Sequence, residues 1–61
     1  MNLPELTYYA GMIMKKNPKI RSRVFDTFDK HRENIKKGGS IPEECEKGYI
    51  SIKKILDDEK I

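Results

Sequence analysis

The residues of this 61-residue chain that could do nucleophilic or acid–base chemistry are few. The chain has one histidine, His31, and one cysteine, Cys45. A Cys–His nucleophile pair needs a further group to orient the imidazole, and no residue in the sequence stands out for that role. The spacing of apolar residues places His31 within an apolar stripe and gives Cys45 the role of a small hydrophobic side chain. We therefore expect no catalytic residue and no enzymatic activity.

The second group that could do chemistry is acidic. Asp26, Asp29 and Glu33 would share one face of a helix, where three carboxylates could gather a hard cation. Lys30 and Lys37 lie among them, and the face should be open to water, so we expect no metal site. The Gly38-Gly39-Ser40 segment lacks the Lys-Ser/Thr ending of a phosphate-binding loop. The sequence therefore predicts neither a metal nor a cofactor.

Basic side chains are the charged group that the sequence concentrates. Residues 15–37 hold nine basic side chains against three acidic ones, whereas residues 38–61 hold four against six. The net charge of +3 therefore understates a strongly cationic middle segment. Such a segment suits an anionic partner, or the acidic part of a second copy of this chain.

A single long helix over residues 18–37 is expected to carry these cations. Its apolar face is formed, at helical spacing, by Ile20, Val24, Phe28, His31 and Ile35. Asn17 and Pro18 predict its start, because Asn caps free N–H groups and Pro suits the first helical position. Gly38 and Gly39 predict its end, since glycine adopts the left-handed cap conformation without strain.

The opposite face of this helix gives the first candidate site. It carries Lys19, Arg23, Lys30 and Lys37. Pairs four residues apart, Asp26–Lys30 and Glu33–Lys37, are expected to form ion pairs. Two interpretations stay open, a solvated face laced with salt bridges and a docking surface for a polyanion or an acidic protein patch.

Two further helices are expected, which makes the chain an all-α, three-helix mini-domain. Residues 3–16 should form an antiparallel hairpin with residues 18–37, because the connection between them is short. Residues 41–57 should form the third helix, with an apolar side made of Ile41, Cys45, Tyr49, Ile52, Ile55 and Leu56. A short strand at residues 49–52 is the alternative, since Tyr-Ile-Ser-Ile alternates. Residues 58–61 are expected to fray, because acidic side chains oppose the dipole at a helix C-terminus.

Apolar residues outside the expected core give the second candidate site. Tyr8 and Met12 lie largely on the outer side of the first helix, and Ile50 points away from the apolar side of the third. A chain this short, without a disulfide, gains little stability from its own core, and oligomerisation is one remaining source of support. We therefore expect Tyr8, Met12 and Ile50 to form an apolar interface with a second copy or another protein.

The composition also bears on the compartment. The longest purely apolar run is residues 12–14, far too short to span a bilayer. The first residues lack the basic region and apolar run of a signal peptide. A single cysteine excludes an intramolecular disulfide and fits a reducing environment. We therefore expect a cytoplasmic protein that does not enter the membrane.

The sequence favours a small helical protein-interaction module, a regulator, inhibitor or adaptor of a larger protein, that associates with itself. The alternative is a small basic nucleic-acid-binding protein whose middle helix contacts phosphates. A helix-turn-helix mode is disfavoured because the third helix opens with Glu43, Glu44 and Glu46, which would repel the DNA backbone.

Overall fold

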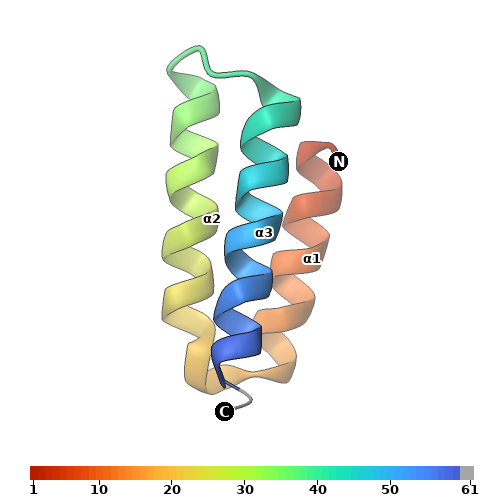
Figure 1. The fold of residues 1–61 in the computed structure, drawn as a ribbon, viewed down its shortest axis with the longest axis vertical. Coiled ribbons are helices and arrows are strands. Elements are labelled where there is room, and N and C mark those ends of the chain that lie inside the picture. Colours follow the sequence, from red (N-terminus) through yellow and green to blue (C-terminus); the bar gives the residue numbers. More distant parts are fainter. Residues whose placement is uncertain (60–61) are drawn as a thin grey trace.

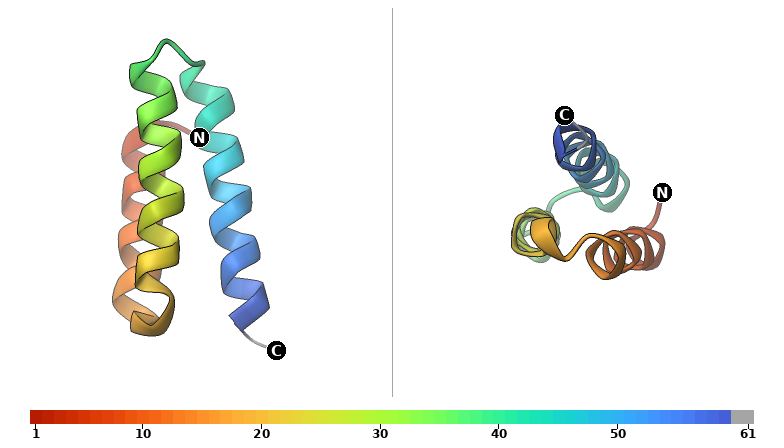
Figure 2. Two further views of the ribbon diagram at one scale, coloured as in Figure 1. Left: turned by 90° about the vertical axis from the view of Figure 1, so that its left-hand side faces the viewer. Right: turned by 90° about the horizontal axis from the view of Figure 1, so that it is seen from below.

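The computed structural model describes residues 1–59 and consists of three helices in one bundle, of which the first and third run down and the middle one runs up in the view of Figure 1. The helices are α1 (Leu3–Lys16), α2 (Arg21–Lys36) and α3 (Ile41–Glu59), and a short 3-10 turn, η1 (Pro18–Ile20), precedes α2. Seen along its axis, the bundle has a triangular cross-section, with each helix packed on the other two (Figure 2). The predicted all-α, three-helix fold is confirmed.

The first helix begins at a capping box that the sequence encodes locally. The Asn2 side-chain oxygen accepts the Glu5 backbone N–H at 2.9 Å, and the Glu5 carboxylate accepts the Asn2 backbone N–H at 3.3 Å. These two bonds satisfy donors that have no partner within the helix. The expected start and end of α1 are both correct.

The connection between α1 and α2 differs from the expectation. Asn17 does not cap the following helix. Instead, its backbone N–H and its side-chain amide both donate to the Ile13 carbonyl, at 2.9 and 3.2 Å, and so cap the end of α1. Pro18 then opens η1, and the regular α-helix begins at Arg21 rather than at residue 18. An Asn-Pro pair can serve either neighbouring helix, and here the unpaired carbonyls of α1 take the amide.

The turn between α2 and α3 is a Schellman motif, in which each glycine has a separate role. The N–H of Gly38 donates to the Ile35 carbonyl at 3.0 Å, and the N–H of Gly39 donates to the Asn34 carbonyl at 2.9 Å. Gly38 has a φ of +103°, which side chains disfavour. A Cβ on Gly39 would lie 2.7 Å from the Asn34 carbonyl oxygen. The prediction that these glycines end the middle helix is confirmed.

The third helix is continuous and longer than expected. Residues 49–52 are helical, so the alternative of a short strand there is wrong. The helix ends at Glu59 rather than at residue 57, and so includes Asp58 and Glu59, which we expected to fray. Residues 60 and 61, the rest of the stretch expected to fray, lie outside the described residues.

The core lies along the axis of the bundle and draws on all three helices. Its buried side chains are Leu6, Ala10, Ile13, Ile20, Val24, Cys45 and Ile52, and Leu3, Tyr9, Met14, Phe28, Ile35, Tyr49, Ile55 and Leu56 pack around them. The apolar faces expected for the middle and third helices are therefore correct, with one exception. Ile41 is 48% exposed, because it opens α3 at the end of the bundle beyond most of the core.

Gly48 is a position at which side chains of α1 and α2 both pack against α3. A Cβ placed on this residue would lie 3.1 Å from Leu6 Cδ2 on α1 and 3.4 Å from His31 Cδ2 on α2. A glycine in mid-helix costs about 1 kcal/mol relative to alanine. That cost is offset by close contact of α3 with both neighbours, because a larger side chain would push the helices apart.

Among residues 1–59, no helix combines the length and the apolar character needed to cross a membrane.

The contact at Gly48 predicts opposite effects for one substitution at two helical glycines. Gly48→Leu should lower the free energy of unfolding by about 1–3 kcal/mol, because the side chain would enter space filled by Leu6 and His31. Gly11→Leu should raise it by up to about 1 kcal/mol, since no atom lies within 4 Å of a Cβ at Gly11 and leucine favours helix. Denaturant unfolding followed by circular dichroism measures both, and equal effects would contradict the close contact.

Candidate functional site

The four cations of the first candidate site all lie on the solvent side of the bundle. Lys19 belongs to η1, Arg23 and Lys30 to α2, and Lys37 caps the end of α2, and each is exposed. On a helix of 3.6 residues per turn, spacings of four and seven bring them into one row. This row follows the side of α2 that faces away from Ile20 and Val24, which are buried.

The ion pairs expected to neutralise this row do not form. In place of Asp26–Lys30 and Glu33–Lys37, α2 pairs Asp29 with Arg32 at 2.7 Å and Glu33 with Lys36 at 3.6 Å. Both observed pairs are three residues apart. Within residues 1–59, Lys19, Arg23, Lys30 and Lys37 therefore have no carboxylate within 4 Å. Their charge remains available to an anion.

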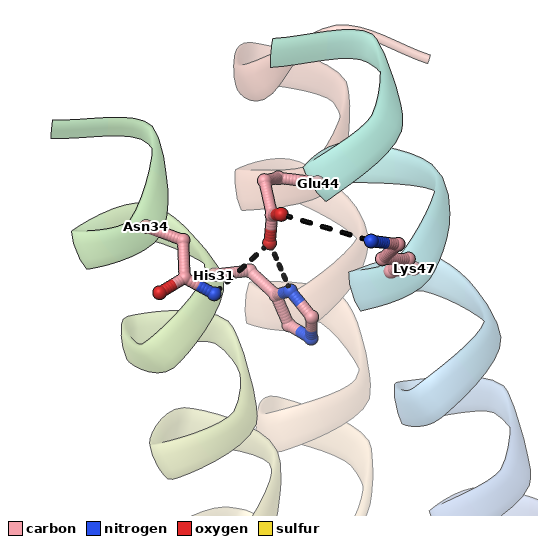
Figure 3. A network of polar contacts seen from close by, with 4 residues as sticks. All are labelled: His31, Asn34, Glu44 and Lys47. Atoms are coloured by element: carbon pink, nitrogen blue, oxygen red, sulfur yellow. Dashed lines mark hydrogen bonds and ion pairs between the residues drawn. The ribbon is translucent and has the colours of Figure 1, made fainter. Parts of the chain in front are cut away.

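A polar network joins α2 to α3 beside this row (Figure 3). One oxygen of Glu44 lies 2.8 Å from His31 Nδ1 and accepts a bond from the Asn34 amide at 3.1 Å. The other oxygen lies 4.0 Å from Lys47 Nζ. The side chains of His31 and Glu44 are only 12% and 13% exposed, so this contact is shielded from water. Two hydrogen bonds lower the pKa of the Glu44 carboxyl. The bond with His31 has the larger effect and the bond from Asn34 the smaller one.

Two expectations about these residues need correction. The sequence suggested that nothing orients His31, yet Glu44 holds its ring. Glu44 itself was expected only as one of three acids opening the third helix. No local pattern indicates this pairing, because the two residues are thirteen positions apart on different helices. Only the turn at Gly38 and Gly39 brings them face to face.

The network also identifies which cations of α3 lie beside those of α2. Lys30 is four residues before Asn34, and Lys47 is three residues after Glu44, so each lies on the same side of its helix as its network neighbour. Because Asn34 and Glu44 are hydrogen-bonded, Lys30 and Lys47 border the same boundary between α2 and α3. Lys47 was not a candidate in the sequence analysis.

A second pair follows from the antiparallel packing of these two helices. Both rise about 1.5 Å per residue, so seven steps along α3 correspond to seven steps back along α2. Lys54, seven residues after Lys47 and also exposed, therefore lies at the level of Arg23, seven residues before Lys30. We define the cationic surface as Lys19, Arg23, Lys30, Lys37, Lys47 and Lys54. It lies along the boundary between α2 and α3, which run side by side in Figure 1.

The three residues of the second candidate site, Tyr8, Met12 and Ile50, are not all exposed. Tyr8 is 75% exposed and Ile50 is 56% exposed, as expected for apolar residues outside the core. Met12, however, is partly covered. The ring contact of Tyr9 with Tyr49, at 4.9 Å between centroids, places positions 9 and 49 at one level of the α1/α3 boundary. Tyr8 precedes Tyr9 and Ile50 follows Tyr49 in the sequence, but both lie on the outer sides of their helices.

A groove that the sequence analysis did not anticipate lies between α1 and the start of α2. Its volume is about 820 Å³, and its lining consists of Gly11, Met14, Lys15, Pro18, Arg21, Ser22, Phe25 and Asp26. Phe25 is half exposed there. The spacing of the core residues of α2 skips Phe25, and the side of the bundle that it faces depends on how α1 packs.

The cysteine lies in the core, as expected. Cys45 is fully buried, and burial raises the pKa of its thiol. The thiol therefore stays protonated near neutral pH and is a poor nucleophile. Within the described residues, no three His, Cys, Asp or Glu side chains gather closely enough to hold a metal ion.

No protein-family model, curated protein or solved structure matches this chain.

The Glu44 network predicts a pH dependence of stability. A carboxyl whose pKa is lower in the folded state than its ordinary value of 4.5 adds stability above that value and loses it as the pH falls further. Glu44→Gln should therefore be less stable than the parent at about pH 6 and should lose less stability on acidification to about pH 3. Urea unfolding across this range measures the difference. Glu43→Gln, at an exposed neighbouring carboxylate, is the control, and matching pH profiles for the parent and Glu44→Gln would contradict the assignment.

Proposed function

We propose that this protein binds nucleic acid through the cationic surface, by contacts with phosphates and without catalysis. The proposal is carried by two rows of exposed basic side chains, four from η1 and α2 and two from α3, which helical spacing and antiparallel packing place on one face. Such a surface releases counterions when it meets a polyphosphate, which favours binding at low salt.

The local charge balance supports this proposal. Asp26, Glu33, Glu43 and Asp58 each lie four residues from a cation of this surface, and Glu33 is paired with Lys36. The other three carboxylates border six cations, which leaves an excess of three positive charges on this face. Most of the remaining acids lie elsewhere or are already paired, as Asp29, Glu33 and Glu44 are.

The structure also changes the order in which the two functions are preferred. The sequence ranked protein interaction first because it offered apolar residues outside the core and expected ion pairs on the basic face. Those ion pairs are absent from α2, and Met12 is partly covered. The cationic surface therefore has more unpaired positive charge than the sequence indicated. The candidate apolar interface of Tyr8, Met12 and Ile50 has less exposed area than the sequence indicated.

The first test measures binding of a fluorescent duplex to the parent and to charge-reversal variants by anisotropy. The parent should bind at about 50 mM salt and lose affinity steeply towards about 200 mM. The double variant Arg23→Glu/Lys30→Glu should bind roughly tenfold more weakly or worse, because it removes two adjacent phosphate contacts.

The matched control is Lys16→Glu/Lys53→Glu, which makes the same change in net charge at exposed positions outside the cationic surface. This variant should keep most of the affinity. Absence of binding by the parent at low salt would contradict the proposal. An equal loss in both variants would also contradict it, since only the total charge would then matter.

A second candidate function is the helical protein-interaction module, a small regulator, inhibitor or adaptor that associates with itself. The specific observation in its favour is Tyr8, the most exposed of the large apolar side chains, with Ile50 half exposed on α3. Monomeric proteins tolerate single exposed apolar residues, but tyrosine is enriched at protein interfaces, where it supplies a large contact area. Self-association would also extend the small core of a chain without disulfides.

Self-association is tested by measuring mass in solution over a range of concentrations, by light scattering or sedimentation. The parent should be a dimer or larger, and Tyr8→Glu and Ile50→Glu should each shift it to a monomer, because a carboxylate would be buried without a partner. Phe25→Glu, on the α1/α2 side, is the control and should leave the mass unchanged. A monomeric parent at every concentration would rule out self-association.

A further inference from the structure

We infer that the cationic surface binds the backbone of a double helix in preference to a single strand. This inference rests on the nucleic-acid-binding function proposed above and names the form of nucleic acid that fits it.

Aromatic side chains, which single-strand binders use to stack bases, all lie away from this surface. The chain has five of them. Tyr9 and Tyr49 pack on each other at the α1/α3 boundary, Phe28 packs against the core, and Phe25 lines the α1/α2 groove. Tyr8 lies on the outer side of α1. Proteins that hold single strands without sequence preference gain much of their affinity from base stacking. This face offers charge without stacking.

The cations instead form two parallel rows. Packed helices lie about 8–10 Å apart, and residues seven positions apart on one helix are separated by about 10.5 Å. A duplex presents two lines of phosphates across a groove about 6 or 12 Å wide, whereas a single strand presents one line. Lys30 beside Lys47, and Arg23 beside Lys54, therefore match two strands better than one.

The surface is also poorly suited to reading base edges. Asn34, an amide that could contact bases, has its side-chain nitrogen bonded to Glu44. Five of the six cations are lysines, which act as mobile point charges rather than as planar forks for guanine. Contacts of this kind position a protein on the phosphate backbone without specifying sequence. The long axis of the bundle, 35 Å, spans about ten base pairs.

The test compares a duplex with each of its separated strands, at matched salt, by anisotropy. The duplex should bind roughly tenfold more tightly than either strand, with a slope of log affinity against log salt near −5 if all six cations contact phosphates. Lys47→Gln/Lys54→Gln should reduce that slope by about 2, because it neutralises the α3 row. The control Lys16→Gln/Lys53→Gln should leave the slope unchanged.

The outcomes separate this inference from the function on which it rests. Equal or tighter binding of single strands would overturn the preference for duplex and leave nucleic-acid binding intact. Absence of binding to every nucleic acid would overturn both. Polyglutamate that displaces the duplex at equal charge concentration would assign the surface to acidic proteins and overturn the inference. A slope unaffected by the two α3 substitutions would remove Lys47 and Lys54 from the surface.

Discussion

The close approach of three helices at Gly48 is the constraint on which the rest of this structure depends. A helix position without a side chain allows Leu6 of α1 and His31 of α2 to reach the backbone of α3 at the same level. In a chain with so few buried side chains, close packing of this kind matters more than in a larger domain. The same contact sets the height at which α2 and α3 face each other.

The register set at Gly48 has a direct consequence one turn away, at Glu44. That carboxylate bridges from α3 to His31 and Asn34 on α2, in a position largely shielded from water. The carboxylate at the boundary between the two helices is therefore already hydrogen-bonded to α2. Lys30 and Lys47 lie on either side of this bridge. The acidic group paired with Lys47 there is the second oxygen of Glu44, which lies 4.0 Å from the Nζ atom.

The three faces of the bundle consequently differ in chemistry. The α2/α3 face is cationic, the α1/α3 face is centred on the Tyr9–Tyr49 contact, and the α1/α2 face holds the groove with Phe25. This division places the proposed nucleic-acid contact on one side of the bundle and the exposed apolar residues Tyr8 and Ile50 outside that side.

Sequence alone determined the helices, their apolar faces and the glycine turn, because helix capping and periodicity depend on residues within a few positions of each other. The Asn2–Glu5 box and the Gly38-Gly39 cap are of this local kind. The row of cations on the middle helix was accessible for the same reason.

Tertiary structure decided which residues of different helices meet, since that depends on rotation and register between helices, which no local pattern encodes. The Glu44–His31 bridge, the place of Phe25 in a groove and the addition of Lys47 and Lys54 to the cationic surface all follow from it. The choice of Asn17 to cap the helix before it rather than the one after it was likewise settled only by the folded chain, because both ends compete for the same amide.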